Sequence, residues 1–164
     1  MLILDTMVVI HLAKITLLEK SCDYFKPVVI PEAVYDEVIT GRKKGFEDVS
    51  VVETLLKSGK LSREHLRSKA LLKRAWEFNI QRAEAEALAV YWQEEAGYLA
   101  SDDDSLRRKR LLLNVKLIGT PAIILTLYQA KRIDKNKLHD SLRELRKIGW
   151  FSGAVIDTIL MEAQ

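Results

Sequence analysis

MLILDTMVVIHLAKI (residues 1–15) opens the chain with a short apolar run that leads directly into a helical pattern. Residues 1–4 are too few and too apolar for anything but a buried strand. Asp5 and Thr6 come next, and both residue types favour the N-terminus of a helix. Residues 7–14 then predict a helix, so the chain begins with a buried strand joined to a helix by an aspartate.

Strands and helices continue to alternate along the rest of the chain. Short apolar runs predict strands at residues 27–30, 98–101 and 116–118. Apolar spacing of three and four residues predicts helices at 32–40, within 42–61, and at 62–78, 81–96, 135–148 and 152–162, with a further helix carrying the basic run 107–110.

Glycine, proline and threonine mark several of the predicted helix ends. Pro31 is expected at a first helical position and Gly41 is expected to end the helix over 32–40. In Gly119-Thr120-Pro121, Thr120 is expected to cap a helix whose first turn contains Pro121.

This alternation predicts an α/β fold. Strands separated by helices pair in parallel through right-handed crossovers, and helices then cover both faces of the sheet. Four to five strands are expected. The chain has 164 residues and 48% hydrophobic content, which is ample for one core, so we expect a single domain over residues 1–164.

Composition excludes several classes of protein. No apolar stretch approaches the ~18 residues of a membrane span, and the N-terminus lacks the basic start and cleavage site of a signal peptide. The lone Cys22 cannot form an internal disulfide, which fits a reducing compartment, so a cytoplasmic location is expected. The formal net charge of +3 does not by itself predict a partner.

Acidic residues stand where predicted elements meet. Asp5 ends the first predicted strand, and Asp102 and Asp103 end the strand over 98–101. Sites in open α/β sheets gather at the carboxyl ends of the strands, so these carboxylates converge if the two strands are neighbours. Glu37 and Glu84 border the apolar stripes of their helices, which is costly for an acid unless it is neutralised.

A divalent cation would remove the repulsion within such a set. Carboxylates in one pocket otherwise take up protons near neutral pH. Oxygen ligands without a cysteine or histidine cluster suit Mg²⁺ or Mn²⁺ rather than Zn²⁺. The alternative is structural: an aspartate after a strand is often only a helix cap, and a lone glutamate on a helix is usually solvated. His11, His65 and His139 have no spacing typical of a metal site or triad, and are expected to be structural or exposed.

A basic run follows the acidic turn. Arg107 and Arg108 lead it and would hold the phosphates of a nucleic acid beside the acids, whereas a solvated helix face is the alternative.

Five blocks of the sequence resemble the PIN-domain superfamily, and in particular its VapC-like archaeal and bacterial branch. They are LILDTMVVIHLAKI, VVIPEAVYDEV, AEAEALAV, YLASDDDSLRRKR and LIGTPAIILTLYQAKRI, and they extend from Leu2 to about Leu160. The resemblance implies a three-layer α/β/α fold and divalent-metal-dependent RNA cleavage that leaves 5′-phosphate and 3′-hydroxyl ends. It also implies a homodimer and, for a toxin, an antitoxin partner.

The resemblance extends to single residues. Asp5 matches the first aspartate of the family pattern, Glu37 the glutamate of the proline-start block, and Glu84 the acid that opens the E-A-E-A helix. Asp103 matches the acid of a Thr-x-Asp turn in which Ser101 takes the threonine place, and Asp102 is commonly acidic in this branch. All five acids are therefore predicted as metal ligands and catalytic residues.

Position 7 departs from the family pattern. Many relatives carry a small polar residue there, whereas this chain has Met7. Met7 favours an alternative in which a PIN-like scaffold binds RNA or a protein partner with weak or no catalysis. Met7 also excludes a phosphatase of the haloacid dehalogenase type, because that chemistry needs a second aspartate two residues after the first.

Overall fold

One parallel sheet organises the molecule. The computed structural model describes residues 1–42, 48–149 and 151–164. Within these residues the sheet has the order β3-β2-β1-β4-β5, and every neighbouring pair is parallel. Its strands are β1 (Leu2–Leu4), β2 (Val28–Pro31), β3 (Ser62–Glu64), β4 (Tyr98–Ala100) and β5 (Leu117–Ile118). The prediction of an α/β fold with a parallel sheet of four to five strands is confirmed.

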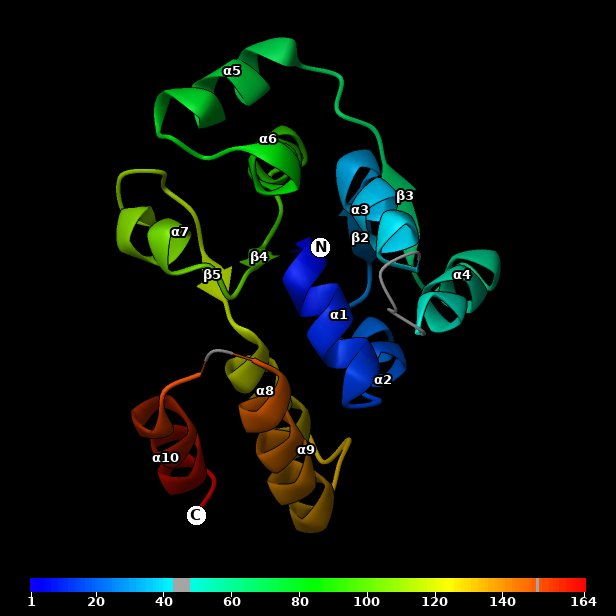
Figure 1. Ribbon diagram of the computed structural model, residues 1–164, viewed down its shortest axis with the longest axis vertical. Helices are drawn as coiled ribbons and strands as arrows, with labels where there is room; N and C mark the ends of the chain where they lie inside the picture. The colour runs from blue at the N-terminus through cyan, green and yellow to red at the C-terminus, as the bar shows by residue number, and fades with distance from the viewer. Residues whose placement is uncertain (43–47, 150) are drawn as a thin grey trace.

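Helices form the two outer layers. They are α1 (Thr6–Lys14), α2 (Leu18–Tyr24), α3 (Glu32–Arg42), α4 (Val49–Lys57), α5 (Lys69–Glu77), α6 (Arg82–Gln93), α7 (Asp104–Lys109), α8 (Thr120–Gln129), α9 (Lys135–Ile148) and α10 (Gly153–Glu162). Figure 1 shows α5, α6 and α7 on one side of the row of strands, and α1, α2, α8 and α9 on the other. This is the three-layer α/β/α arrangement that the sequence predicts.

The core is centred on β1 and α6. All three residues of β1 are buried, as expected for a central strand of a parallel sheet. Helix α6 packs against β1, β2 and β4. Its buried side chains include Ala85, Ala87 and Ala89, whose small size favours close packing of α6 among the strands, α3 and α5. This close packing holds the N-terminal turn of α6 near the carboxyl ends of β1 and β4.

The register of β1 and β4 brings Asp5 beside Ser101. Leu4 pairs with Ala100, and the backbone N–H of Asp5 donates to the carbonyl of Ala100 at 3.1 Å. The expectation that the strands ending at Asp5 and at Asp102 are neighbours is therefore confirmed.

The predicted helix over residues 62–78 is wrong in its first part. The structure has β3 there, followed by α5 with Ser68 as its N-cap. Strand β3 is a largely exposed edge strand with no apolar residue, so its pairing with β2 leaves no periodic signal in the sequence. Arg63 in β3 is held by Glu32 and lies 3.7 Å from the centre of the Tyr35 ring.

Three predicted helix ends also differ from the structure. Pro31 is the last residue of β2, and α3 begins at Glu32. Gly41 does not end α3, because glycine lowers helix propensity without breaking the hydrogen bonds. Gly119 is the N-cap of α8, and the Thr120 hydroxyl instead donates to Asp102. The placement of Pro121 in the first turn is confirmed.

Within the described ranges, no helix is both long enough and apolar enough to cross a membrane.

Candidate active site

Asp5 lies at the centre of the candidate site. It is the N-cap of α1, and its Oδ1 accepts from the backbone N–H of Val8 at 2.9 Å. It is only 3% exposed, and the Ser101 side chain also hydrogen-bonds to it. Asp5 thus serves as a helix cap, as the structural alternative expected, and it also keeps a buried carboxylate at the strand end.

Burial raises the pKa of the Asp5 carboxyl group. Desolvation raises the pKa of Asp5 to about 7, against the opposing effect of the Ser101 and Val8 hydrogen bonds, and the charges of Asp102 and Glu84 raise it further. Desolvation also raises the pKa of Glu84, with additional contributions from the charges of Asp103 and Glu37. The charge of Arg82 opposes this rise at Glu84. Among the described residues no cation forms an ion pair with Asp5 or Glu84, so the negative charge of the site is only partly compensated.

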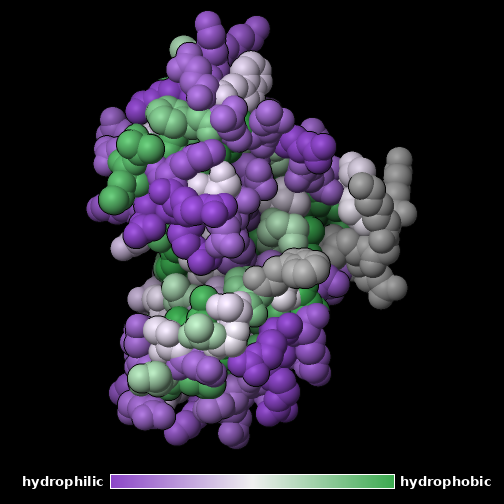
Figure 2. All heavy atoms as spheres, turned by 60° about the vertical axis from the view of Figure 1, so that its left-hand side comes forward, coloured by the Kyte–Doolittle hydropathy of each residue, from purple (hydrophilic) through white to green (hydrophobic). Residues whose placement is uncertain are grey.

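Two cavities meet at these acids. The larger, of about 450 Å³, is lined by Asp5, Glu84 and Met7 together with Asp102, Asp103, Asp104, Arg107 and part of the α10 N-terminus. The smaller, of about 160 Å³, shares Asp5, Glu84 and Met7 and adds Thr6, Glu37, Arg82 and Ala83. Figure 2, which brings the side with α7 and α10 forward, shows hydrophilic surface over most of the upper part of the molecule. The five predicted site acids therefore all line these adjoining cavities.

Glu37 and Glu84 reach the site from helices. Glu37 is exposed on α3, and its Oε2 accepts from the Thr6 hydroxyl at 2.7 Å, which ties it to the first turn of α1. Glu84 is half-buried in the first turn of α6. Its neighbour Glu86 is engaged elsewhere, because its Oε1 accepts from the Ala33 backbone N–H at the start of α3.

Asp102 and Asp103 have different surroundings although they are adjacent. Asp103 is the N-cap of α7, with Oδ1 accepting from the Leu106 backbone N–H at 2.6 Å. Asp102 accepts from Thr120 with both oxygens and from His11 with Oδ2. Asp103 therefore keeps one oxygen free of the bonds described here, whereas both oxygens of Asp102 are in use.

The acids border an open cavity and do not form a closed cage. Among the described residues, no three histidine, cysteine or acidic side chains are arranged as a ready ligand set for a metal ion. Mg²⁺ does not need such a set, because it keeps several waters and binds through one or two carboxylates plus substrate phosphates. Oxygen-only donors, an excess of negative charge and space for water are the properties that fit a hard divalent cation.

A family model described as PIN domain matches residues 1–164. The chain belongs to the PIN-domain family. PIN domains are generally nucleases that typically bind RNA and use divalent metals, so the family accounts for carboxylates gathered at the strand ends. No curated protein and no solved structure shows a significant match to this PIN domain.

The two predicted RNA-binding arginines are placed differently. Arg107 lines the larger cavity and lies 3.3 Å from Asp104, one helical turn earlier. Arg108 is exposed on α7 and lines neither cavity. Four consecutive basic residues on a helix cannot all face one way, so only part of this run reaches the site.

Three residues at the site of this PIN domain were not predicted from its sequence. Arg82 lines the smaller cavity and has a φ of 56°, which is unusual for a residue with a side chain. His11 and Thr120 hold Asp102. A histidine on the apolar face that carries Val8 and Leu12 was the available signal, since a buried imidazole requires a polar partner.

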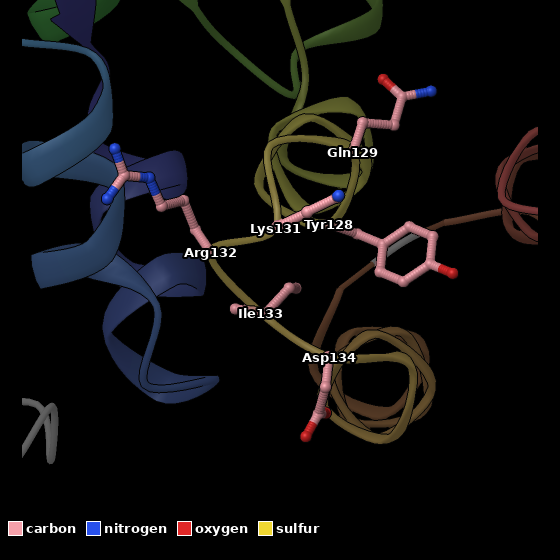
Figure 3. A pocket seen from close by; sticks show the side chains of 6 residues that line it. All are labelled: Tyr128, Gln129, Lys131, Arg132, Ile133 and Asp134. Carbon is pink, nitrogen blue, oxygen red and sulfur yellow. The ribbon is translucent and has the colours of Figure 1, made fainter.

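A further hollow lies at the turn between α8 and α9. It has a volume of about 540 Å³ and is lined by residues 128, 129 and 131–134. In Figure 3, Tyr128, Gln129 and Arg132 point in different directions. These side chains do not converge on a common point, so the hollow lacks the chemistry of the acidic cavities.

Proposed function

We propose that this PIN domain is a ribonuclease that hydrolyses phosphodiester bonds with the help of Mg²⁺ or Mn²⁺. The observation that carries the proposal is the buried Asp5 carboxylate, which shares two cavities with Glu84 and lacks a cationic partner among the described residues. Uncompensated acids of this kind are costly in a protein that does not bind a cation.

Asp5, Glu84, Asp103 and Glu37 are the proposed ligands, and Asp102 completes the predicted set of catalytic acids. A bound divalent cation would lower the pKa of a water and offset charge on the phosphate. The acids orient that water towards phosphorus. The resemblance implies 5′-phosphate and 3′-hydroxyl ends, and these ends require that the water oxygen bonds to phosphorus while the bond from phosphorus to the 3′ oxygen breaks and that oxygen takes up a proton. The products are a 5′-phosphate and a 3′-hydroxyl.

Two arginines would hold the RNA backbone. Arg107 lines the larger cavity and Arg82 the smaller one, and both cavities include Asp5 and Glu84. Guanidinium groups bind phosphate oxygens through paired hydrogen bonds. We propose that they hold phosphates flanking the scissile one, and that Arg108 adds longer-range attraction from the exposed surface.

Cleavage of a single-stranded RNA with mixed sequence tests the proposal. The wild-type protein is expected to cleave with Mg²⁺ or Mn²⁺, to stop in excess chelator, and to give fragments that a 5′-phosphate-dependent exonuclease degrades. Asp5→Asn keeps the cap of α1, because asparagine is an equally good N-cap, but removes the charge. It is expected to abolish cleavage.

Equal cleavage by wild type and Asp5→Asn would contradict the proposal. Asp157→Asn is the matched control, since Asp157 is an exposed acid on α10 that lines neither cavity and forms only a 3.7 Å ion pair with Arg146. This control is expected to cleave like the wild type.

A non-catalytic RNA-binding scaffold is the second candidate function. It is favoured by Met7, which lines both cavities, is 45% exposed, and brings a thioether where a polar side chain would assist a hard cation. RNA retention without cleavage under all metal conditions would support the scaffold. If Met7→Ser then restores cleavage, the side chain at position 7 is the cause.

The resemblance to VapC-like proteins also suggests partners. A homodimer is proposed, for which Leu111 and Leu112 supply apolar surface, being 84% and 73% exposed. Sedimentation of the wild type and of Leu111→Ser tests this contact.

We also propose the role of a cytoplasmic toxin, with an antitoxin that blocks the acidic cavities. Growth arrest on expression, and its relief by a neighbouring gene product, test this role.

A further inference from the structure

Asp102 differs from Asp103 and the two glutamates of the site because both of its carboxylate oxygens already accept hydrogen bonds. Its side chain is only 7% exposed. Oδ1 accepts from the backbone N–H of Thr120 at 2.7 Å. Oδ2 accepts from the Thr120 hydroxyl at 2.5 Å and from Nδ1 of His11 at 2.8 Å. A carboxylate has about four lone-pair positions, so three are already occupied.

The donors to Asp102 come from two elements far apart in the sequence. His11 is on α1, which follows β1, and Thr120 is the first residue of α8, which follows β5. Asp102 itself follows β4, so the three residues connect the carboxyl ends of β1, β4 and β5. Gly119 allows this approach, because a Cβ at that position would lie 3.2 Å from Oδ1 of Asp102.

A second set of bonds runs from the same turn to the cavity. The Ser101 side chain hydrogen-bonds to Asp5, and its Oγ accepts from the backbone N–H of Asp103 at 3.2 Å. Ser101 and Asp103 flank Asp102 in the chain. Bonds that fix Asp102 therefore also restrain its neighbour Ser101, which contacts both Asp5 and Asp103.

We infer that Asp102 is a positioning residue, held by His11 and Thr120, that orients Asp5 and Asp103 towards the cation without binding the cation itself. This inference rests on the proposed function. Coordination through Oδ2 would require Asp102 to give up its hydrogen bond to His11 or to the Thr120 hydroxyl, which would leave a buried donor without a partner. Oδ1 keeps one lone-pair position, but the Gly119 backbone approaches this oxygen so closely that a Cβ there would lie 3.2 Å from it. Asp103, which is bound through one oxygen to the α7 cap, has no such conflict.

Mn²⁺ titration by calorimetry separates the two roles. Thr120→Val keeps the volume of the side chain but removes its hydroxyl, and it is expected to weaken Mn²⁺ binding by about ten-fold, as loss of an outer hydrogen-bond partner does. Thr120→Ser keeps the hydroxyl and is expected to restore the affinity to within about two-fold of wild type. Asp102→Asn is expected to keep the stoichiometry with a similar ten-fold loss, whereas Asp5→Asn abolishes binding.

The opposite pattern would overturn the inference. If Asp102 is a ligand, Asp102→Asn abolishes Mn²⁺ binding as Asp5→Asn does, and Thr120→Val leaves the affinity unchanged or tighter because it frees one lone-pair position on Oδ2. Equal affinities for Thr120→Val and Thr120→Ser would also contradict a role for the hydroxyl.

Amide hydrogen exchange gives a readout that needs no metal. Thr120→Val is expected to accelerate exchange at the Asp103 amide, and Thr120→Ser to restore it, while amides in α9 stay unchanged and show that the fold is intact. Unchanged exchange at Asp103 would overturn the positioning role. If the wild type binds no Mn²⁺ but the exchange pattern appears, the proposed function fails and the contact between Asp102 and the Asp103 turn stands.

Discussion

The acids at the strand ends and the acids on the helices meet in one site but are held in different ways. Asp5 and Asp102 are buried, and each accepts several hydrogen bonds from neighbouring backbone and side chains. Glu37 is exposed and is tied by one hydroxyl, and Glu84 is half-buried in the first turn of its helix. One half of the site is fixed by the sheet, and the other half is held by fewer contacts.

This difference separates two tasks. Groups fixed by several hydrogen bonds hold their geometry before any ligand arrives, which lowers the cost of binding. Glu37 and Glu84 have longer side chains and fewer bonds, so they can adjust to a cation together with its waters and a phosphate. We expect changes at Asp5 to abolish cation binding and changes at the glutamates to weaken it.

The largest expected effect on RNA cleavage comes from replacing Glu84 or Glu37 by glutamine. Glu84→Gln is expected to reduce RNA cleavage by about 100-fold, at the upper end of losses seen when a group that supports a metal is removed. Glu37→Gln is expected to cost about ten-fold, because Glu37 is more exposed. Glu86→Gln is the matched control, since that side chain serves α3 and not the cavities.

Single-turnover rates and Mn²⁺ affinities of the three variants decide the outcome. If Glu84→Gln and Glu37→Gln abolish Mn²⁺ binding as Asp5→Asn does, the two halves of the site do not differ in the way described. If Glu86→Gln costs as much as Glu84→Gln, Glu84 has no specific role in the site.

The next effect concerns the stability of the metal-free protein. A pKa raised from 3.8 to about 7 means that the folded state resists ionisation of Asp5. Folding stability is therefore lost as pH rises from about 4 to 7, and the full effect corresponds to roughly 4 kcal/mol. Asp5→Asn removes this charge and is expected to stabilise the metal-free protein at pH 8 by about 2 kcal/mol, since part is offset by weaker hydrogen bonds.

Urea unfolding of wild type and Asp5→Asn at pH 4.5 and pH 8, both in chelator, measures this effect. The gain is expected at pH 8 and should be small at pH 4.5. A variant that is less stable than wild type at both pH values would show that the buried carboxylate is not under electrostatic strain.

The smallest expected effect is a difference in KM for RNA between variants of Arg107 and Arg108 on α7. Arg107→Ala is expected to raise the KM for RNA by roughly five-fold and to lower the salt dependence of binding by about one phosphate contact, with little change in kcat. Arg108→Ala is expected to change KM by less than about two-fold, because Arg108 lines neither cavity. Equal effects would show that α7 acts as a diffuse basic face.

Much of the fold could be predicted because short apolar runs and turn residues indicate the strands and the helix ends from neighbouring residues alone. The buried strands β1, β2 and β4 each appear as short apolar runs, and Asp5 stands at the first strand–helix junction. Strand β3 could not be predicted, because it is an exposed edge strand that exists only through its pairing with β2.

The candidate site could be predicted as a set of acids, but the task of each acid could not. Strand-end position brought Asp5, Asp102 and Asp103 together, whereas the division between Asp102 and Asp103 depends on His11 and Thr120, which lie 91 and 18 residues from Asp102. Contacts over such separations leave no local pattern.

Anomalous diffraction from crystals soaked in Mn²⁺ tests the central claim most directly. A manganese peak is expected in the cavities shared by Asp5 and Glu84, within about 2.5 Å of an Asp5 oxygen, with both oxygens of Asp102 still bound to Thr120. Absence of a peak at saturating Mn²⁺, or a peak away from Asp5, would contradict the account.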